Sequence, residues 1–482
     1  MAIKGITYIL PDCYNSDKFY FGTDQGLVYY GVLNGEISEY KIIDISPLSY
    51  VNSMKQIDGE IWLACDNGIG VVKEGEIYTL SKVPLNNSVE NVMIDYSGNM
   101  WFTSSRQGVM KIVPNQFSDL FEKYNLGGRV VNSTCIFGDI LFMGTDNGLI
   151  AVDEKADCVL ESIPITQAYT PSGLLLDITD LLQMLGDVRI RSIIRDSHDR
   201  IWFSTWKSYG LVCYDNGFLT VYSTDDGLPS TRVRTIHECK DGRILVACTG
   251  GVAVIQDDKI VKSFTESSGI ENTEILTVTE AENGDIIAGS DGGGIYILSN
   301  SRTTYLGTDD DLNSEVIMRI KKSVNGDFFW IVTSNSIAFM DEGDYKITTI
   351  QHFPYPNNFD VYENSQGDVW ILSSNGIYVE RRDVLHANGE VFPVFYGKEN
   401  GLQTISTSNS YSELTDDGYL YIAGSTGVVK VNIETPIEGV NDVKVAVPFI
   451  EVDGKVLYPN EDGSFVIDSL LGNFSFAIAN NS

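Results

Sequence analysis

The chain has 482 residues, a formal net charge of -33 and 43% hydrophobic residues. This length exceeds one ordinary hydrophobic core, so we expect several domains or an array of repeats. The acidic balance weighs strongly against nucleic acid, whose phosphates are bound by clustered lysine and arginine, and against a bare anionic membrane surface.

The chain opens with MAIKGITYILPDC, which lacks the long apolar core and the cleavage site of a secretory signal peptide. It begins directly in a strand-like pattern, and we expect the natural start to lie elsewhere. No stretch is apolar enough for a membrane-spanning helix. The seven cysteines include no CxxC pair, and several, such as Cys65 and Cys248, lie in apolar strand patterns. We therefore expect no zinc site.

One short pattern recurs along the chain: an acidic residue, a polar turn, an aromatic or aliphatic residue and then small residues. It is IRDSHDRIWFST at Ile194 to Thr205 and IDYSGNMWFTS at Ile94 to Ser104. Eight of the nine gaps between copies measure 39 to 51 residues, which is the blade period of a β-propeller. The residues at the Trp position are Tyr20, Trp62, Trp101, Phe142, Trp202, Leu245, Ile287, Trp330, Trp370 and Tyr421.

Each unit divides into four short strands separated by turns. Around Leu245 the strands are RVRTIHEC, RILVACT, VAVIQ and KIVKSF, with a hairpin turn at Asp241-Gly242. Such units form four-stranded antiparallel blades, and the aromatic residue on the second strand fills the wedge between neighbouring blades. The fold class predicted is therefore all-β.

Two segments depart from the repeat. The 60-residue gap holds an insertion at 158–188, where LLLDITDLLQMLGD predicts a short amphipathic helix. From about Thr435 the pattern changes to strands joined at Asp453-Gly454 and Asp462-Gly463, which is typical of the first half of a β-sandwich. Half a sandwich leaves an open edge, so we expect the natural protein to continue.

The units resemble the two-component regulator propeller repeats of bacterial sensor proteins. The stretches that carry this resemblance are DSHDRIWFST, DGLPSTRVRTIHECKDGRILVACTGGVAVI, AENGDIIAGSDGGGIYI and TDDGYLYIAGSTGVVKVN. The tail resembles the start of the immunoglobulin-like domain that follows such propellers. The resemblance implies an extracytoplasmic (periplasmic or cell-surface) sensor region of a membrane-anchored protein, which relays binding of carbohydrate fragments to an intracellular kinase or cyclase module.

The repeat count then predicts three parts. Residues 1–116 form three blades of an incomplete upstream propeller, 117–434 form a complete seven-bladed ring, and 435–482 begin an Ig-like β-sandwich. The last unit of the ring lacks its own outer strand, which we expect Phe117 to Tyr124 to supply.

The sequence contains no catalytic motif, since HExxH, GxSxG and the P-loop are absent and the four histidines are scattered. We expect no catalytic residue, no metal and no cofactor. A propeller glycosidase or polysaccharide lyase is the alternative, since its acid pair comes from distant blades; a scaffold that binds only protein is another. Turnover of a glycan panel, or binding without turnover, separates these classes.

Propeller geometry predicts the ligand-binding face. The loops that lead into each first strand open on the same face as the second-to-third loops, so DGLPST, GIENTE and DDLNSE converge with TWKSYG and TSSRQG. The candidate ligand-binding residues on this face are Trp206, Tyr209, Arg232, Asn272, Asn313 and Ser314. The expected ligand is a small molecule or oligosaccharide, a sulfated polyanion being less favoured unless Arg106, Lys207 and Arg232 cluster. A homodimer that covers the exposed edge of the first three blades is a further hypothesis.

Overall fold

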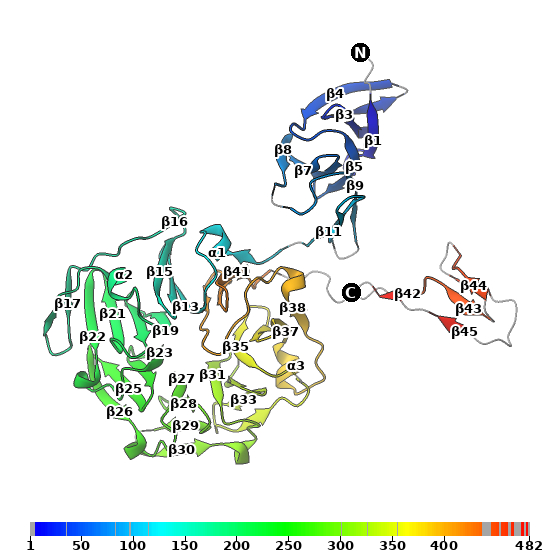
Figure 1. Ribbon diagram of the computed structural model, residues 1–482. Coiled ribbons are helices and arrows are strands. Elements are labelled where there is room, and N and C mark those ends of the chain that lie inside the picture. The colour runs from blue at the N-terminus through cyan, green and yellow to red at the C-terminus, as the bar shows by residue number, and fades with distance from the viewer. Residues whose placement is uncertain are drawn as a thin grey trace. The chain divides into compact units, whose positions relative to one another are not determined.

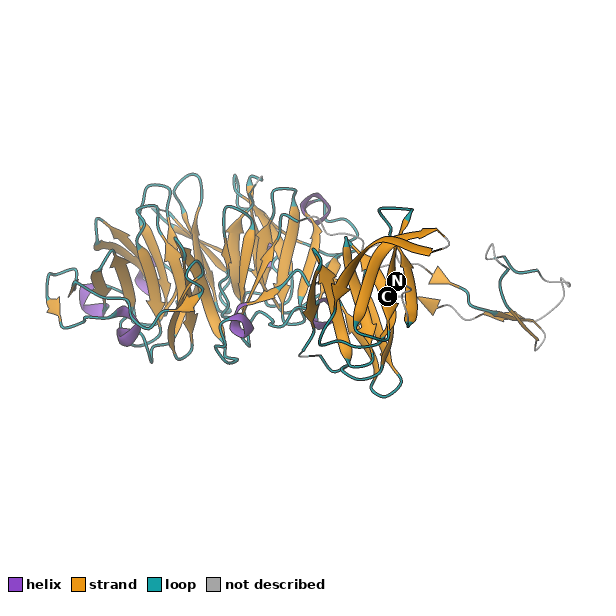
Figure 2. Cartoon of the chain, turned by 90° about the horizontal axis from the view of Figure 1, so that it is seen from above, coloured by secondary structure: helices purple, strands orange, loops and turns teal. Residues whose placement is uncertain are grey.

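A computed structural model describes residues 5–34, 36–81, 83–95, 98–113, 115–299, 301–324, 326–353, 355–435, 445–452, 455–460, 464–466, 474–476 and 479–480. The chain separates into two units, Asn115–Ile437 and Met1–Pro114 together with Glu438–Ser482. Strands dominate and helices are short (Figure 2), which confirms the all-β class. The domain bounds at 116 and 434 stay a prediction.

Seven sheets surround one axis in the described part of Asn115–Ile437 (Figure 1). Six of them contain four consecutive antiparallel strands. Their strands are β13 (Val131–Phe137), β14 (Ile140–Thr145), β15 (Gly148–Asp153) and β16 (Cys158–Val159); β19 (Ile190–Arg195), β20 (Ile201–Thr205), β21 (Leu211–Asp215) and β22 (Phe218–Tyr222); β23 (Val233–Glu238), β24 (Ile244–Cys248), β25 (Gly251–Gln256) and β26 (Lys259–Phe264); β27 (Ile275–Glu280), β28 (Ile286–Ser290), β29 (Ile295–Leu298) and β30 (Thr303–Leu306); β31 (Ile317–Lys322), β32 (Phe328–Thr333), β33 (Ile337–Asp341) and β34 (Ile347–Thr349); and β35 (Asn358–Glu363), β36 (Asp368–Ser373), β37 (Ile377–Arg381) and β38 (Val394–Tyr396).

The seventh sheet joins the two ends of the ring. It contains β39 (Glu413–Leu414), β40 (Tyr419–Ala423), β41 (Val428–Asn432) and, as its outer strand, β12 (Ser118–Asp119) from the start of the unit. Ser118 pairs with Lys430 and Asp119 with Val429. The helix α1 (Leu120–Lys123) follows directly, with Asp119 as its N-cap. A strand from one end of the chain segment therefore completes the sheet made by the other end.

The recurring acid, turn and tryptophan form one hydrogen-bonded unit. The Asp196 carboxylate accepts the backbone N–H groups of His198 and Arg200 at 3.0 and 2.9 Å, and the Trp202 Nε1–H at 2.8 Å. Asp95 accepts the Trp101 Nε1–H at the same distance of 2.8 Å. The acid thus shapes the hairpin and fixes the indole that packs between sheets, which accounts for the repetition of both residues.

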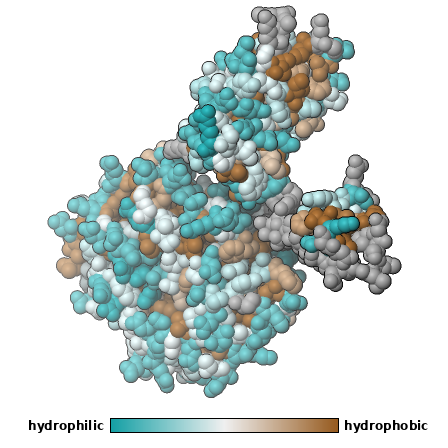
Figure 3. Space-filling view, turned by 45° about the vertical axis from the view of Figure 1, so that its right-hand side comes forward, coloured by the Kyte–Doolittle hydropathy of each residue, from teal (hydrophilic) through white to brown (hydrophobic). Residues whose placement is uncertain are grey.

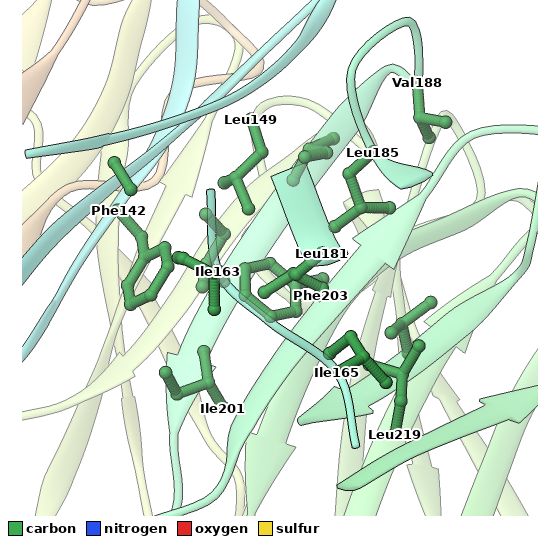
Figure 4. Packing of buried hydrophobic residues seen from close by; sticks show 14 of the residues in the cluster. Phe142, Leu149, Ile163, Ile165, Leu181, Leu185, Val188, Ile201, Phe203 and Leu219 are labelled. Atoms are coloured by element: carbon green, nitrogen blue, oxygen red, sulfur yellow. The ribbon is translucent and has the colours of Figure 1, made fainter. Parts of the chain in front are cut away.

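The insertion packs over the second sheet of the ring. Its strands β17 (Gln167–Tyr169) and β18 (Leu175–Leu176) extend that sheet, with β17 parallel to β22, and α2 (Leu181–Met184) follows. Leu181 and Leu185 lie against Phe203 in the cluster of buried residues of Figure 4. The short helix predicted in the insertion is present. Two further helices, α1 and α3 (Arg382–His386), were not expected from the sequence. Of the stretch Phe117 to Tyr124, predicted as the outer strand, only Ser118–Asp119 is a strand and Leu120–Lys123 is helical.

Three sheets make up the described part of Met1–Pro114. Two have four strands: β1 (Ile6–Pro11), β2 (Lys18–Thr23), β3 (Leu27–Asn34) and β4 (Glu36–Asp44); and β5 (Val51–Ile57), β6 (Glu60–Cys65), β7 (Gly68–Lys73) and β8 (Glu76–Thr79). The third has β9 (Val89–Ile94), β10 (Met100–Ser104) and β11 (Gly108–Ile112). Their first strands contact one another in turn, β1 with β5 and β5 with β9.

Residues after 444 form two small sheets. The pairs are β42 (Val445–Ala446) with β46 (Ala479–Asn480), and β43 (Ile450–Val452) with both β44 (Lys455–Leu457) and β45 (Phe474–Phe476). The predicted turn at Asp453-Gly454 falls between β43 and β44, but it lies outside the described residues, as does Asp462-Gly463. Among the described residues no helix is long and apolar enough to cross a membrane.

Candidate functional site

A cavity of about 380 Å³ lies at the axis of the ring, where the inner strands begin. Four of its lining residues, Arg191, Arg234, Leu276 and Met318, stand second in the inner strands β19, β23, β27 and β31. Side chains alternate along a strand, so one register position in successive sheets turns to the same place. The remaining lining residues are Asp291, Val316, Arg319, Ser408, Asn409 and Tyr411.

The segment before β39 reaches the axis and forms one wall of this cavity. The Tyr411 hydroxyl donates to the Leu276 carbonyl at 2.9 Å, and the Tyr411 N–H donates to the Asn132 carbonyl at 2.7 Å. The Arg319 guanidinium lies 3.5 Å from the Tyr411 ring and donates to the Ser410 carbonyl. These bonds tie Ser408–Tyr411 to three other sheets and hold it rigidly against the cavity.

Arg191 is a buried cation whose guanidinium has no hydrogen bond or ion pair in the part of the chain that the structure describes. Its exposed fraction is 7%, and its Nε–H lacks an acceptor. Burial, together with the charges of Arg234 and Arg189, lowers its pKa to about 10. The neighbouring Asp146 carboxylate is paired with Arg189 at 3.1 Å. Arg191 therefore remains cationic at neutral pH and has unused donors.

Trp206 organises the arginines beside the cavity. The guanidinium carbons of Arg234, Arg191 and Arg232 lie 4.4, 5.3 and 5.8 Å from its ring centre. The backbone N–H of Trp206 donates to the Arg189 carbonyl at 2.9 Å, which fixes the start of β19. Cation–π contacts of this kind orient guanidinium planes and offset part of the repulsion among like charges. Three cations are thus held around one indole.

The structure brings together two of the six residues predicted for ligand binding. Trp206 and Arg232 form a bridge between their backbones and lie beside Arg191 and Arg234. Tyr209 packs instead against the apolar cluster under the insertion. Neither Trp206 nor Tyr209 is fully exposed.

The other three predicted residues hold their own loops. Asn272 donates to the Asp291 carbonyl at 2.8 Å and accepts from the Glu274 N–H at 3.0 Å. The Asn313 amide oxygen accepts from the Ser336 hydroxyl at 2.5 Å, and Ser314 and Ser334 share a hydrogen bond of 2.9 Å. Their role in ligand binding stays a prediction, as does that of Tyr209.

A second, smaller cavity of about 190 Å³ continues the axis and shares Arg319 and Tyr411 with the first. Here Asp360 pairs with Arg319 at 3.4 Å and with Lys321 at 2.6 Å. Burial raises the pKa of the nearby Glu413 to about 7, against the opposing effects of a backbone hydrogen bond and nearby cations. Burial also lowers the pKa of His237, which lines the same cavity. In this inner cavity Arg319 and Lys321 share Asp360 as their partner, whereas Arg191 has no carboxylate partner among the described residues.

A larger cavity, of about 450 Å³, lies at the hairpin ends of the sheets, and several of the charged residues that line it pair with one another. Arg200 pairs with Asp258 at 2.7 Å, and Arg243 pairs with Asp241 at 2.7 Å. The nearby acidic groups Asp196 and Glu238 accept hydrogen bonds from the turn around Ser197. This region is therefore explained by turn formation.

Arg191 and Arg234 were not predicted as site residues, because they lie on inner strands and the predicted residues were taken from loops. A usable signal was present: arginine occupies the second position of the inner strand in two consecutive units, in the stretches RIRS and RVRT. That position lines the axial cavity in four successive units, and in the other two of these units it holds Leu276 and Met318. Asn409 and Tyr411 belong to a segment without repeat character, and no local pattern placed them at the axis.

These sheets define a β-propeller with a cavity at its axis. Residues 184–207, which include β19, β20 and Trp206, match the family model described as "Two component regulator propeller". The predicted resemblance is therefore confirmed for this repeat. No curated protein matches the chain in sequence.

Two solved structures from B. thetaiotaomicron are similar to this chain. One is the extracellular domain of a protein described as the hybrid two component system BT3049, with a TM-score of 0.68, 19% identity, and coverage of 96% of this chain and 61% of that one. The other is the extracellular domain described for BT4673, with a TM-score of 0.54, 15% identity, and coverage of 95% and 62%. The chain thus spans about three fifths of the length of these domains, and the likeness shows the fold.

Proposed function

We propose that this chain is the ligand-sensing region of an extracytoplasmic bacterial signalling protein, and that its ligand, a carbohydrate fragment, binds in the axial cavity of the ring. Binding is then relayed to an intracellular kinase or cyclase module of the full protein. The observation that carries the proposal is the cavity of about 380 Å³ with an unpaired, buried Arg191 at its wall. A fixed cavity with a few oriented polar groups is the usual form of a small-ligand site.

Sensing without catalysis is favoured by the polar groups around the cavity. The wall offers arginine, serine and asparagine donors, and its one carboxylate, Asp291, has no second acid beside it in the lining. Glycoside hydrolysis ordinarily needs two carboxyl groups flanking the bond that breaks. The matched propellers BT3049 and BT4673 are described as extracellular domains of signalling systems, which supports the same role and location for this chain.

A panel of plant and host glycans tests the proposal. Calorimetry on the 482-residue chain measures binding, and chromatography of the same mixtures measures turnover. Binding without turnover is the expected result. Cleavage of any glycan supports the hydrolase or lyase alternative, and binding of none leaves a protein-binding scaffold.

A further inference from the structure

We propose that the axial cavity recognises its ligand through a negatively charged group, a carboxylate or a sulfate ester, that is held between Arg191 and Arg234. The inference rests on the proposed function, because it specifies the ligand of the same site. It concerns the chemical class of that ligand: an acidic saccharide in place of a neutral one.

Arg191 lacks the carboxylate partner that several other arginines of the ring have. Arg200 pairs with Asp196 at 2.7 Å, Arg243 with Glu280 at 2.6 Å and Arg319 with Asp360 at 3.4 Å. Arg191 is 7% exposed, and its guanidinium lies over the Trp206 ring without a hydrogen bond or ion pair among the described residues. Burying a charge without a partner costs free energy, so a protein retains such a group where a ligand supplies the opposite charge.

The wall of the axial cavity carries a cluster of cations, although the protein as a whole is acidic. The chain carries a net charge of -33, yet Arg191 and Arg234 meet at one wall, with Arg232 and Arg189 beside them. The acidic groups that face this cluster are few: Asp146 is paired with Arg189, and Asp291 lies in the cavity lining. Two guanidinium groups present parallel donors that fit a planar or tetrahedral oxyanion in a bidentate manner.

The rest of the cavity wall offers polar groups and an apolar side. Arg234 Nη1 donates to the Asn409 side-chain oxygen at 3.2 Å, so the Asn409 amide N–H₂ stays available as a donor. This N–H₂ group and the Ser408 hydroxyl line the cavity and suit the hydroxyl groups of a sugar. Leu276, Val316 and Met318 supply an apolar side for a ring face. The cavity falls within the range of about 300–1,000 Å³ that small ligands occupy.

Calorimetry with matched probes tests the charge. Oligogalacturonides carry carboxylates, chondroitin sulfate disaccharides carry sulfate and carboxylate, and galacto-oligosaccharides of the same length are neutral. We expect an acidic probe to bind, and its affinity to fall as salt rises from low to high ionic strength. Arg191→Gln should weaken that binding at least tenfold, and Arg234→Gln, a change at a less buried residue, should weaken it in the same direction.

Arg195→Gln is the matched control. Arg195 lies on the same strand β19, carries the same charge and pairs with Asp199 at the hairpin end, away from the cavity lining. It should leave binding unchanged. The two acidic probes distinguish a carboxylate from a sulfate, since only the sulfated disaccharide should bind if sulfate is the recognised group.

Each outcome decides the inference. Binding of neutral probes with unchanged affinity in Arg191→Gln and Arg234→Gln overturns the charged ligand and leaves the sensor function standing. Failure of both acidic probes to bind also overturns it. If the neutral glycans fail as well, the proposed function falls too.

Discussion

The same motif stands in two environments, in the ring at Trp202 and in the three-sheet unit at Trp101. Both indoles donate to an aspartate six residues earlier at 2.8 Å. Trp202 is fully buried, whereas Trp101 is only partly buried. The local hydrogen bonds are therefore set by the motif, but burial depends on whether a further sheet packs against the outer face.

The facing positions on the next strand repeat this difference. Leu211, paired with Ser204, is 0% exposed, and Val109, paired with Thr103 at the equivalent position, is 64% exposed. Next to them, Cys213 in the ring corresponds to Lys111 in the third sheet. Figure 3 shows hydrophobic surface on the Met1–Pro114 unit, and the exposed apolar residues there include Ile9, Ile42 and Met93. A closed ring buries both faces of every sheet, and a short array leaves its end faces to water.

The largest expected effect separates the two tryptophans. Trp202→Ala should cost about 3–5 kcal/mol, because it leaves a cavity between two sheets and removes one of the hydrogen bonds to the Asp196 carboxylate. Trp101→Ala should cost less than half of that, since its ring is already partly hydrated. Denaturant titration followed by peptide-level hydrogen exchange measures each unit in the intact chain. Equal losses of stability in the two variants would contradict the difference in burial between Trp202 and Trp101.

The repeat, the strand order and the helix in the insertion were predictable because they follow from local signals. Period, Asp-Gly turns and the leucine spacing of 174–187 are properties of neighbouring residues. The axial site was less accessible. Trp206 and Arg232 were predicted from loop geometry. Arg191 could not be singled out in the same way, because its lack of a carboxylate partner depends on how several inner strands converge at the axis. Whether a charge is paired depends on residues from several repeats, so the sequence of one repeat does not reveal it.

A second test removes the charge that joins turn and indole. Asp196→Asn should lower stability by about 1.5–3 kcal/mol, the range for hydrogen bonds to a charged group. Burial raises the pKa of Asp196, but hydrogen bonds from Trp202 and Arg200 outweigh it, and the net pKa is lowered. The stabilisation is thus present at neutral pH and lost as the pH falls through the lowered pKa. Thermal unfolding between pH 3 and pH 7 should show a smaller acid loss in the variant; an unchanged acid loss contradicts the assignment.

A third test concerns Glu413, whose carboxyl group is buried at the axis of the closed ring. Burial raises the pKa of Glu413 to about 7, so its protonated form is favoured in the fold. Its contribution is fully present below the unfolded pKa, near 4.5, and is lost as the pH rises through 7. Glu413→Gln should therefore reduce the fall in Tm between pH 5 and pH 8, by about 2–4 °C. His237 titrates in both proteins and cancels in the difference.

The smallest effect should come from the exposed counterpart of Leu211. Val109→Ser should change stability by no more than about 0.5 kcal/mol, because its side chain already lies in water. Leu211→Ala, at the equivalent buried position, should cost about 2–5 kcal/mol, and it is the control that shows the assay responds. Denaturant titration of both variants, with sedimentation velocity over a range of protein concentrations, completes the test. A large loss on Val109→Ser, together with a shift from dimer to monomer, would mean that a second copy covers this face and that the three-sheet unit is completed in solution as the ring is completed within itself.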